Sequence, residues 1–339
     1  MNRGDRMKLI KKIQEKRDSE LLVYVTGDRR GMETKIATDV FPMFHKHLTK
    51  NGSQRRIDLF LYSTGGITIA GYALVNLFRE FCNEFNVIIP FKAYSCATLI
   101  ALGANEVLMT KMGQLSPIDP SVEHPLGPIV QLPDQPGMGR IAPVNVEDVN
   151  AFIDLAKKEF GLNEEESMRK VFEILASKVN PLVLGAVQRS REQIAFLASI
   201  LMSYHTRDKE RIEKTVNTLT RERFSHDYII SKKEAKETLG LNIIEPDKEL
   251  TSYIIELFNA YNEIIMMDRP YHPEVVLGTE NLKVNNFNRA IIESIDLTYV
   301  FRTTKEIKRV EVQQPGIPYP IIAYQERVLQ EEWVVDNSM

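Results

Sequence analysis

Short apolar runs alternate with stretches of helical periodicity over the first third of the chain. Buried strands are predicted at four apolar runs, which are residues 21–25, 59–62, 87–93 and 107–110. Helices are predicted between or beside them, at residues 36–48, 68–85 and 96–104. Strands that interleave with helices in this way are typical of a parallel sheet with helical crossovers. The pattern therefore predicts an α/β fold.

The pattern changes after residue 119. Prolines and glycines crowd residues 125–143, which predicts a mobile loop that we expect beside the substrate cleft. Helical periodicity then returns, and it predicts helices at residues 145–160, 164–178 and 189–221.

A composition break near Pro246 separates the last part of the chain. Residues 251–267 have the period of an amphipathic helix, and alternating apolar positions at residues 295–301 and 310–312 predict a β-hairpin. The resulting division is a charged N-terminal segment at residues 1–20, a main domain at residues 21–245 and a smaller C-terminal α+β extension at residues 246–339.

Composition excludes several classes of protein. The chain has 339 residues, 43% of them hydrophobic, and a formal net charge of −3, so it can bury a sizeable core and carries no basic patch for nucleic acid or anionic lipid. Cys82 and Cys96, in apolar surroundings, indicate core or site-wall residues in a reducing compartment. The N-terminus lacks an apolar signal sequence, and the longest apolar run, residues 194–202, is shorter than the about 20 residues that span a bilayer. We expect a soluble, cytoplasmic protein that binds neither nucleic acid nor membranes.

Two segments carry the candidate chemistry. Gly65 and Gly66 follow the second predicted strand, where a sharp turn would expose backbone N–H groups. Ser95 follows the next strand and precedes a helix, whose first N–H groups lack acceptors within the helix. A serine hydroxyl beside such donors suits attack on a carbonyl carbon and stabilisation of the oxyanion that forms. We predict Ser95 as the nucleophile and the amides of Gly66 and Cys96 as the oxyanion hole, with Gly65 shaping the turn.

Four motifs, in this order, resemble those of a known family. They are STGGITIAGYAL, KAYSCATLIALGANEVLM, GQLSPIDP and SHDYIISKKEAKETLGL. Over roughly residues 21–244 the chain is similar to the serine dehydrogenase proteinase family of Clp-fold serine peptidases, within the Clp protease/crotonase superfold. The resemblance implies a Clp-like parallel sheet and a hydrolase that cuts peptides or proteins through an acyl-enzyme.

The resemblance also suggests the rest of a catalytic triad. The family's order of Ser, Asp and His falls on Ser95, Asp119 and His226. His226 would be the general base, and Asp119 would orient it, since a triad is defined by geometry and role and not by chain order.

Two other sets of catalytic residues remain open. The order found in Clp peptidases would make His124 the base and Asp227 its orienting partner. A Ser/Lys dyad, as in signal-peptide peptidases of the same superfold, would use Lys92, Lys111 or a lysine on a helix. The remaining histidines are weaker candidates, because we expect three of them at the surface or an interface and one lies in the C-terminal extension: His45, His47, His205 and His272.

The same residues also have structural interpretations. A serine before a helix is most often an N-cap, and Asp119 before Pro120 could begin a turn. Their joint occurrence with a Gly-Gly turn favours the catalytic interpretation. Two other functions remain alternatives, which are crotonase-type acyl-CoA chemistry and a Clp-fold scaffold without peptidase activity.

Expectations about partners follow from the resemblance and from one missing motif. The resemblance implies a homo-oligomer. The chain has no Walker A pattern, so a separate ATPase or adaptor would have to unfold large substrates. No cofactor or metal is expected.

Overall fold

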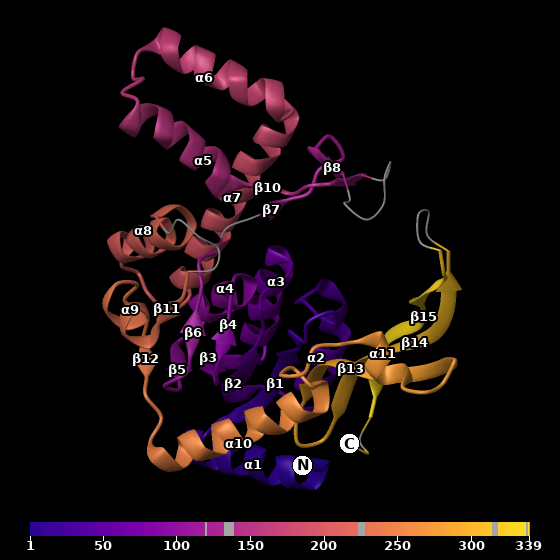
Figure 1. Ribbon diagram of the computed structural model, residues 1–339. Coiled ribbons are helices and arrows are strands. Elements are labelled where there is room, and N and C mark those ends of the chain that lie inside the picture. Colours follow the sequence, from indigo (N-terminus) through magenta and orange to yellow (C-terminus); the bar gives the residue numbers. More distant parts are fainter. Residues whose placement is uncertain (119–120, 132–138, 223–227, 314–317, 337, 339) are drawn as a thin grey trace. The chain divides into compact units, whose positions relative to one another are not determined.

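The computed structural model describes the chain except for residues 119–120, 132–138, 223–227, 314–317, 337 and 339 (Figure 1). The described residues group into two compact units. The first unit combines Met1–Leu115 with Leu241–Met339, and the second unit is Ser116–Gly240. This division differs from the boundaries expected at residues 20 and 245, because the C-terminal segment adds strands to the same sheet as the N-terminal segment.

A mixed sheet forms the centre of the first unit. In spatial order its strands are β12 (Ile243–Ile244), β5 (Glu106–Met109), β3 (Cys82–Ile89), β2 (Gln54–Tyr62), β1 (Glu20–Thr26), β13 (Leu282–Glu293), β14 (Thr298–Val312) and β15 (Ile321–Val335). The pairings from β12 to β1 are parallel, and those from β1 to β15 are antiparallel. The predicted α/β fold with a parallel core is confirmed.

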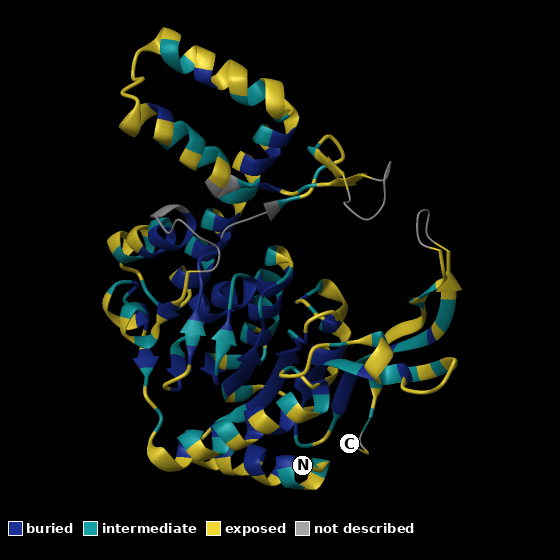
Figure 2. Ribbon diagram, in the orientation of Figure 1, coloured by how far each residue is buried: buried dark blue, intermediate teal, exposed yellow. Residues whose placement is uncertain are grey.

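Helices cover both faces of this sheet. The helices α1 (Arg3–Arg17) and α10 (Lys248–Ile265) lie side by side against one face (Figure 1). Val23 and Val25 of β1 belong to the core on that face, whereas the ring of Tyr24 meets Phe44 of α2 at 5.3 Å on the other. Side chains of a strand alternate between faces, so β1 is buried on both sides. Figure 2 shows the resulting buried centre.

The other face carries helices close to those expected. They are α2 (Phe41–Asn51), α3 (Thr68–Arg79) and α4 (Cys96–Leu102). The helix predicted at residues 68–85 ends earlier, because Cys82 already pairs with Gln54 at the start of β3. The strand predicted at residues 87–93 is interrupted at Pro90, which has no N–H for the ladder, and the chain resumes as β4 (Lys92–Ala93).

The second unit is mainly helical in its described part. Its helices are α5 (Val146–Asp154), followed by a π-helical turn at Leu155–Glu159, then α6 (Glu165–Lys178), α7 (Pro181–Ser203), α8 (Lys209–Asn217), a second π-helical turn at Thr218–Glu222, and α9 (Lys232–Glu237). The proline- and glycine-rich segment contains two short antiparallel pairs, β7 (Ser121–Val122) with β10 (Val144–Asn145) and β8 (Ile129–Gln131) with β9 (Gly139–Ile141).

The long helix predicted at residues 189–221 is wrong. The chain leaves the helix after Ser203 and begins a new one at Lys209, because the Asp208 side chain accepts a hydrogen bond from the N–H of Arg211 and caps α8. No helix in the described ranges is alone long and apolar enough to cross a membrane. The pair α6 and α7, bent by 102°, meets that criterion together, by length and composition only.

The hairpin predicted for the C-terminal segment is also placed differently. Residues 298–312 form the single strand β14, and the polar stretch expected to turn lies within it. The hairpins are instead β13 with β14 and β14 with β15. Much of β14 is half-buried, so its polar side chains do not mark a turn.

A buried ion pair connects the two ends of the chain. The Arg6 guanidinium donates to both carboxylate oxygens of Glu293, at 2.9 and 2.7 Å, and both side chains are fully buried. The hydroxyls of Tyr261 and Thr298 donate to the same carboxylate at 2.6 and 2.7 Å. The pair therefore holds α1, α10, β13 and β14 together with every carboxylate oxygen satisfied.

Removing one partner of this pair should destabilise the fold strongly. We expect Arg6→Met to lower the free energy of unfolding by about 3–5 kcal/mol, because it leaves the Glu293 carboxylate buried without a cation. Urea unfolding followed by circular dichroism measures this loss, and adding Glu293→Gln should recover part of it. Lys8→Met removes an exposed pair with Asp5 and is the control, expected to change stability by less than about 0.5 kcal/mol. Equal effects of Arg6→Met and Lys8→Met would contradict the assignment.

His47 is buried, contrary to the expectation that it lies at the surface or an interface. It is 2% exposed, its Nδ1 lies 2.8 Å from the hydroxyl of Ser294, and its ring packs against Tyr299. Burial lowers the pKa of His47 to about 4, although Glu293 acts in the opposite direction. The neutral imidazole is thus the form that the fold accommodates.

The free energy of unfolding should therefore fall on acidification, because His47 is buried in its neutral form. Between the unfolded value near 6.5 and the folded value of about 4, the unfolded chain binds the extra proton, so stability is lost as pH falls from 7 to 4. The expected contribution is about 3 kcal/mol. It is measured as the difference in pH dependence between the wild type and His47→Gln, with His45→Gln, on the exposed side of α2, as control. Parallel pH profiles for the wild type and His47→Gln would rule this out.

Candidate functional site

The end of β2 lies beside β4, and this pairing places the two predicted catalytic segments together. Ser63 forms a parallel bridge with Ala93, in which the N–H of Ser63 donates to the carbonyl of Lys92 at 3.0 Å. The N–H of Tyr94 donates to the carbonyl of Ser63, also at 3.0 Å. The residues that follow each strand therefore emerge at the same edge of the sheet.

Both glycines of the turn are required by the backbone. Gly65 has φ 117° and Gly66 has φ 156°, in the region that side chains rarely adopt. The N–H of Ile36 donates to the carbonyl of Gly65 at 2.9 Å, and the N–H of Ile67 donates to the carbonyl of Ile36 at 2.8 Å. A Cβ atom on Gly66 would lie 2.1 Å from the carbonyl oxygen of Ile36. A third segment of backbone is thus packed directly against the turn.

Ser95 lies next to this turn in a strained conformation. It precedes α4 with φ 50° and ψ −113°, and its side chain does not cap the helix. A Cβ atom on Gly65 would lie 2.9 Å from the Cβ of Ser95 and 3.4 Å from its Oγ. Ser95 is half-buried. A non-glycine residue with positive φ at this position is typical of a functional constraint.

The N–H groups around Ser95 differ in their hydrogen bonding. The N–H of Gly65 donates to the hydroxyl of Ser63 at 3.0 Å. Within the part of the chain that the structure describes, the N–H groups of Gly66 and Cys96 have no protein acceptor. Two donors next to the serine hydroxyl therefore remain available to a ligand.

Sequence reasoning missed the residues that support the turn from beneath. The buried Ser63 hydroxyl accepts from the Thr26 hydroxyl at 2.7 Å and lies 3.2 Å from the carbonyl of Gly65, to which it donates. Ile36 contributes only backbone groups, so its role could not be read from its side chain. Ser63 lies two residues before Gly65, and this spacing was the one sequence signal for a side chain that supports the turn.

The Cys96 thiol serves packing and not chemistry. Cys96 is fully buried, its Sγ donates to the carbonyl of Ile67 at 3.2 Å, and a Cβ on Gly71 of α3 would lie 2.5 Å from that sulfur. Burial raises the pKa of Cys96 to about 12 and that of Cys82 to about 11. Both thiols therefore stay protonated at neutral pH.

The lysines considered as a base are poorly suited to that task. The Lys92 ammonium forms an ion pair with Asp28 at 2.7 Å, and both side chains are mostly buried. The Lys92 nitrogen is therefore already held by a carboxylate. Lys111 is exposed in the turn after β5.

Only one of the predicted imidazole and carboxylate residues lies among the described residues. Asp119, His226 and Asp227 lie outside the described residues. His124 lies in the second unit, where its Nδ1 accepts a hydrogen bond from the N–H of Leu126 at 3.2 Å. A triad histidine donates from Nδ1 to its carboxylate, so this tautomer does not suit His124 as the base.

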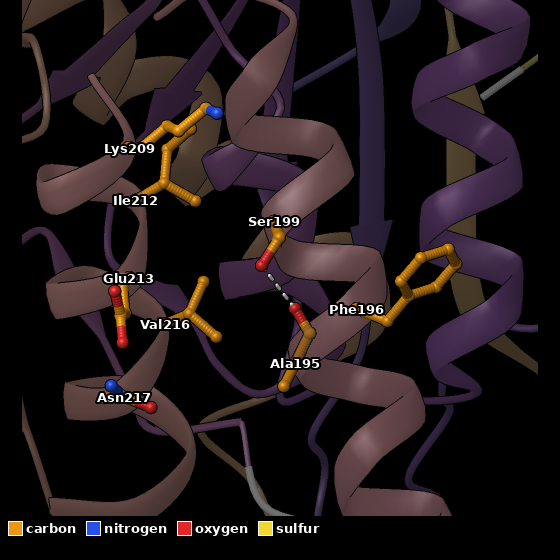
Figure 3. A pocket seen from close by; sticks show the side chains of 8 residues that line it. All are labelled: Ala195, Phe196, Ser199, Lys209, Ile212, Glu213, Val216 and Asn217. Carbon is orange, nitrogen blue, oxygen red and sulfur yellow. Dashed lines mark hydrogen bonds between the residues drawn. The ribbon is translucent and has the colours of Figure 1, made fainter. Parts of the chain in front are cut away.

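A pocket of about 390 Å³ lies between α7 and α8 in the second unit (Figure 3). Its hydroxyl, on Ser199, donates to the carbonyl of Ala195 one turn earlier at 2.8 Å. Ile212 and Val216 line the opposite wall (Figure 3). Among the described residues, no histidine lines this groove between the two helices.

Comparison with known proteins identifies relatives at the level of family and fold. A family model described as ClpP-like SDH-type serine proteinase matches residues 2–181. The uncharacterized protein MJ0137 of Methanocaldococcus jannaschii is 24% identical over 267 residues, covering 75% of this chain and 78% of the relative. The uncharacterized protein MJ1495 of the same organism is 26% identical over 206 residues, and the match spans 60% of this chain but only 56% of that relative.

Two solved structures of variants of the 1510-N membrane-bound stomatin-specific protease also resemble the chain. One has a TM-score of 0.38 at 13% identity and covers 65% of this chain and 79% of that one. The other, in complex with a substrate peptide, has a TM-score of 0.31 at 16% identity and covers 63% and 73%.

The strain at Ser95 generates a stability prediction. Ser95→Gly should be more stable than Ser95→Ala by about 1 kcal/mol, because glycine adopts φ 50° without the penalty that alanine retains. Both variants lose the hydroxyl, so thermal or urea unfolding of the pair isolates the backbone term. If Ser95→Ala unfolds at the higher temperature, the backbone at this position is not strained.

Proposed function

Because the chain belongs to the family of ClpP-like SDH-type serine proteinases and is therefore a serine peptidase, we propose that it cleaves peptide bonds through an acyl-enzyme on Ser95. The observation that carries the proposal is the position of the Ser95 hydroxyl. It lies against a Gly-Gly turn, and a strained backbone holds it there. A hydroxyl presented in this way suits a nucleophile better than a helix cap.

The oxyanion hole in this proposal consists of the N–H groups of Gly66 and Cys96. Both lack a protein acceptor in the described part of the chain, and both belong to segments adjacent to Ser95. The N–H of Gly65 is already bonded to Ser63, which supports a shaping role for Gly65. Backbone donors held by a rigid sheet need no reorganisation when negative charge develops, and this is the source of their effect on rate.

The general base in this proposal is His226, oriented by Asp119. His226 takes the Ser95 proton as Oγ bonds to the carbonyl carbon, and it returns that proton to the departing amine as the C–N bond breaks. Water then gives a proton to His226 and attacks the acyl-enzyme, which releases the acid and restores Ser95. The ion pair of Lys92 and the hydrogen bond to His124 Nδ1 make both alternatives weaker.

The expectations about partners and compartment extend this proposal. We propose a cytoplasmic homo-oligomer that acts on peptides or loosely folded segments and relies on a separate ATPase or adaptor for folded substrates. Large apolar side chains in the second unit support an assembly. Phe172 is 56% exposed, Leu182 66% and Phe196 65%, and Val171 is the one buried residue of α6. Apolar surface of this kind is usually covered by another protein surface.

A fluorophosphonate probe tests the nucleophile. It should label the wild type once per chain, on Ser95, and should not label Ser95→Ala, because only an activated hydroxyl attacks the phosphorus centre. Mass spectrometry of the adduct identifies the residue, and the melting temperature shows that the unlabelled variant is folded. Labelling at another serine, or no labelling of a folded wild type, would refute the acyl-enzyme and favour a scaffold or acyl-CoA chemistry.

The same probe distinguishes the proposed base from its alternatives. His226→Ala should lose labelling by at least about 100-fold, the usual effect of removing a general base, while His124→Ala should label as the wild type does. The labelling of Asp119→Asn should be intermediate between that of His226→Ala and that of His124→Ala. The opposite result for the two histidines would assign the base to His124.

A further inference from the structure

A second pocket in the first unit is lined by two arginines that have no carboxylate partner among the described residues. It has a volume of about 430 Å³ and lies between the end of α10, the short helix α11 (Pro273–Leu277) and β13. Arg29, just after β1, contributes its side chain to the lining, as does Arg269. Its size falls in the range of small-molecule sites.

Arg29 is the main observation. Its side chain is nine-tenths buried, with 9% exposure, and its Nε donates to the carbonyl of Arg269 at 2.8 Å. The guanidinium carbon lies 5.8 Å from the ring of Tyr271 and 6.0 Å from the ring of Phe287. Within the described residues no carboxylate pairs with Arg29. Burial lowers the pKa of Arg29, and the nearby Arg269 adds to that effect.

The surroundings of Arg29 are suited to an anion on an apolar body. One face of β13 lines the pocket with Lys283, Asn285 and Phe287. This face therefore offers a cation, an amide and an aromatic ring to a ligand. Ile264 and Val276 supply apolar walls. Lys283 also pairs with the exposed Glu280 at 2.8 Å, which leaves the two arginines as the uncompensated charges.

We propose that this pocket binds a small organic anion, a carboxylate or phosphate carried on a short apolar group, at a site separate from Ser95. The planar guanidinium of Arg29 binds two oxygens of the anionic group, and Arg269 adds a second positive charge. The apolar part of the ligand lies against Phe287 and Val276. The ligand thus supplies the negative charge that the protein does not place beside Arg29.

Titration calorimetry and thermal melting with three probes of equal chain length test the site. The probes are hexanoate, hexyl phosphate and the uncharged hexanol, added to the full-length protein. We expect at least one of the two anions to bind and to raise the melting temperature, and hexanol to do neither at the same concentration. The tighter of the two anions identifies the preferred head group.

Arg29→Met is the decisive variant. It should melt no lower than the wild type, because it removes a buried cation without a counterion, and it should bind the preferred anion at least about tenfold more weakly. Arg30→Met alters an exposed neighbouring arginine and should bind as the wild type does. Arg269→Gln changes an exposed position and should weaken anion binding without lowering the melting temperature. It replaces Arg29→Met as the test if that variant folds poorly.

Three results would overturn the proposal. The first is that neither anion binds the wild type. The second is that hexanol binds as well as the anions, and the third is that the arginine variants bind the anion with unchanged affinity. A large drop in the melting temperature of Arg29→Met, with no anion binding by the wild type, would assign Arg29 a purely structural role.

Discussion

The close approach of three backbone segments is the constraint on which the candidate site depends. Ile36 bonds to both sides of Gly66, and Gly65 packs against Ser95, so no side chain fits at either glycine. The direction of the N–H groups is therefore set by sheet register and not by adjustable side chains. A strained residue persists where the surrounding structure holds it in place. Here the bridge between Ser63 and Ala93 fixes the backbone two residues before Ser95.

That sheet depends in turn on the C-terminal segment. β1, which ends at Thr26 beneath the Gly-Gly turn, pairs with β2 on one side and β13 on the other. Without β13 the buried strand β1 would become an open edge, with unpaired backbone groups and an uncovered apolar face. The Arg6–Glu293 pair joins the same two ends of the chain. Residues that the sequence pattern separates as an extension thus help to support the candidate site around Ser95.

The sequence was informative where a local rule determines the structure. The pair Gly65-Gly66 predicted the turn because few other residues reach those dihedral angles, and Ser95 lies between a strand and a helix as predicted. Some errors arose where tertiary contacts decide, as at Cys82, which enters a strand because Gln54 lies beside it. Another arose where helical periodicity hid a local cap, since Asp208 begins a new helix within a periodic stretch. His47 has a polar identity but a buried position, which only the packing of β13 and β14 against α2 determines.

Arg29 differs from two other arginines of the first unit, whose guanidinium groups are neutralised by carboxylates. Arg6 is matched by Glu293, and Arg17 bonds to Asp58 at 2.7 Å and to Glu106 at 2.9 Å. The carboxylate next to Arg29 in sequence, Asp28, forms an ion pair with Lys92 of β4 and is therefore not available to Arg29. An apolar side chain would fill the same space without the cost of desolvating a charge, so packing alone does not explain an arginine here. Local rules are most often broken where a protein binds or reacts, and a bound anion is the partner that would restore the balance of charge at this position.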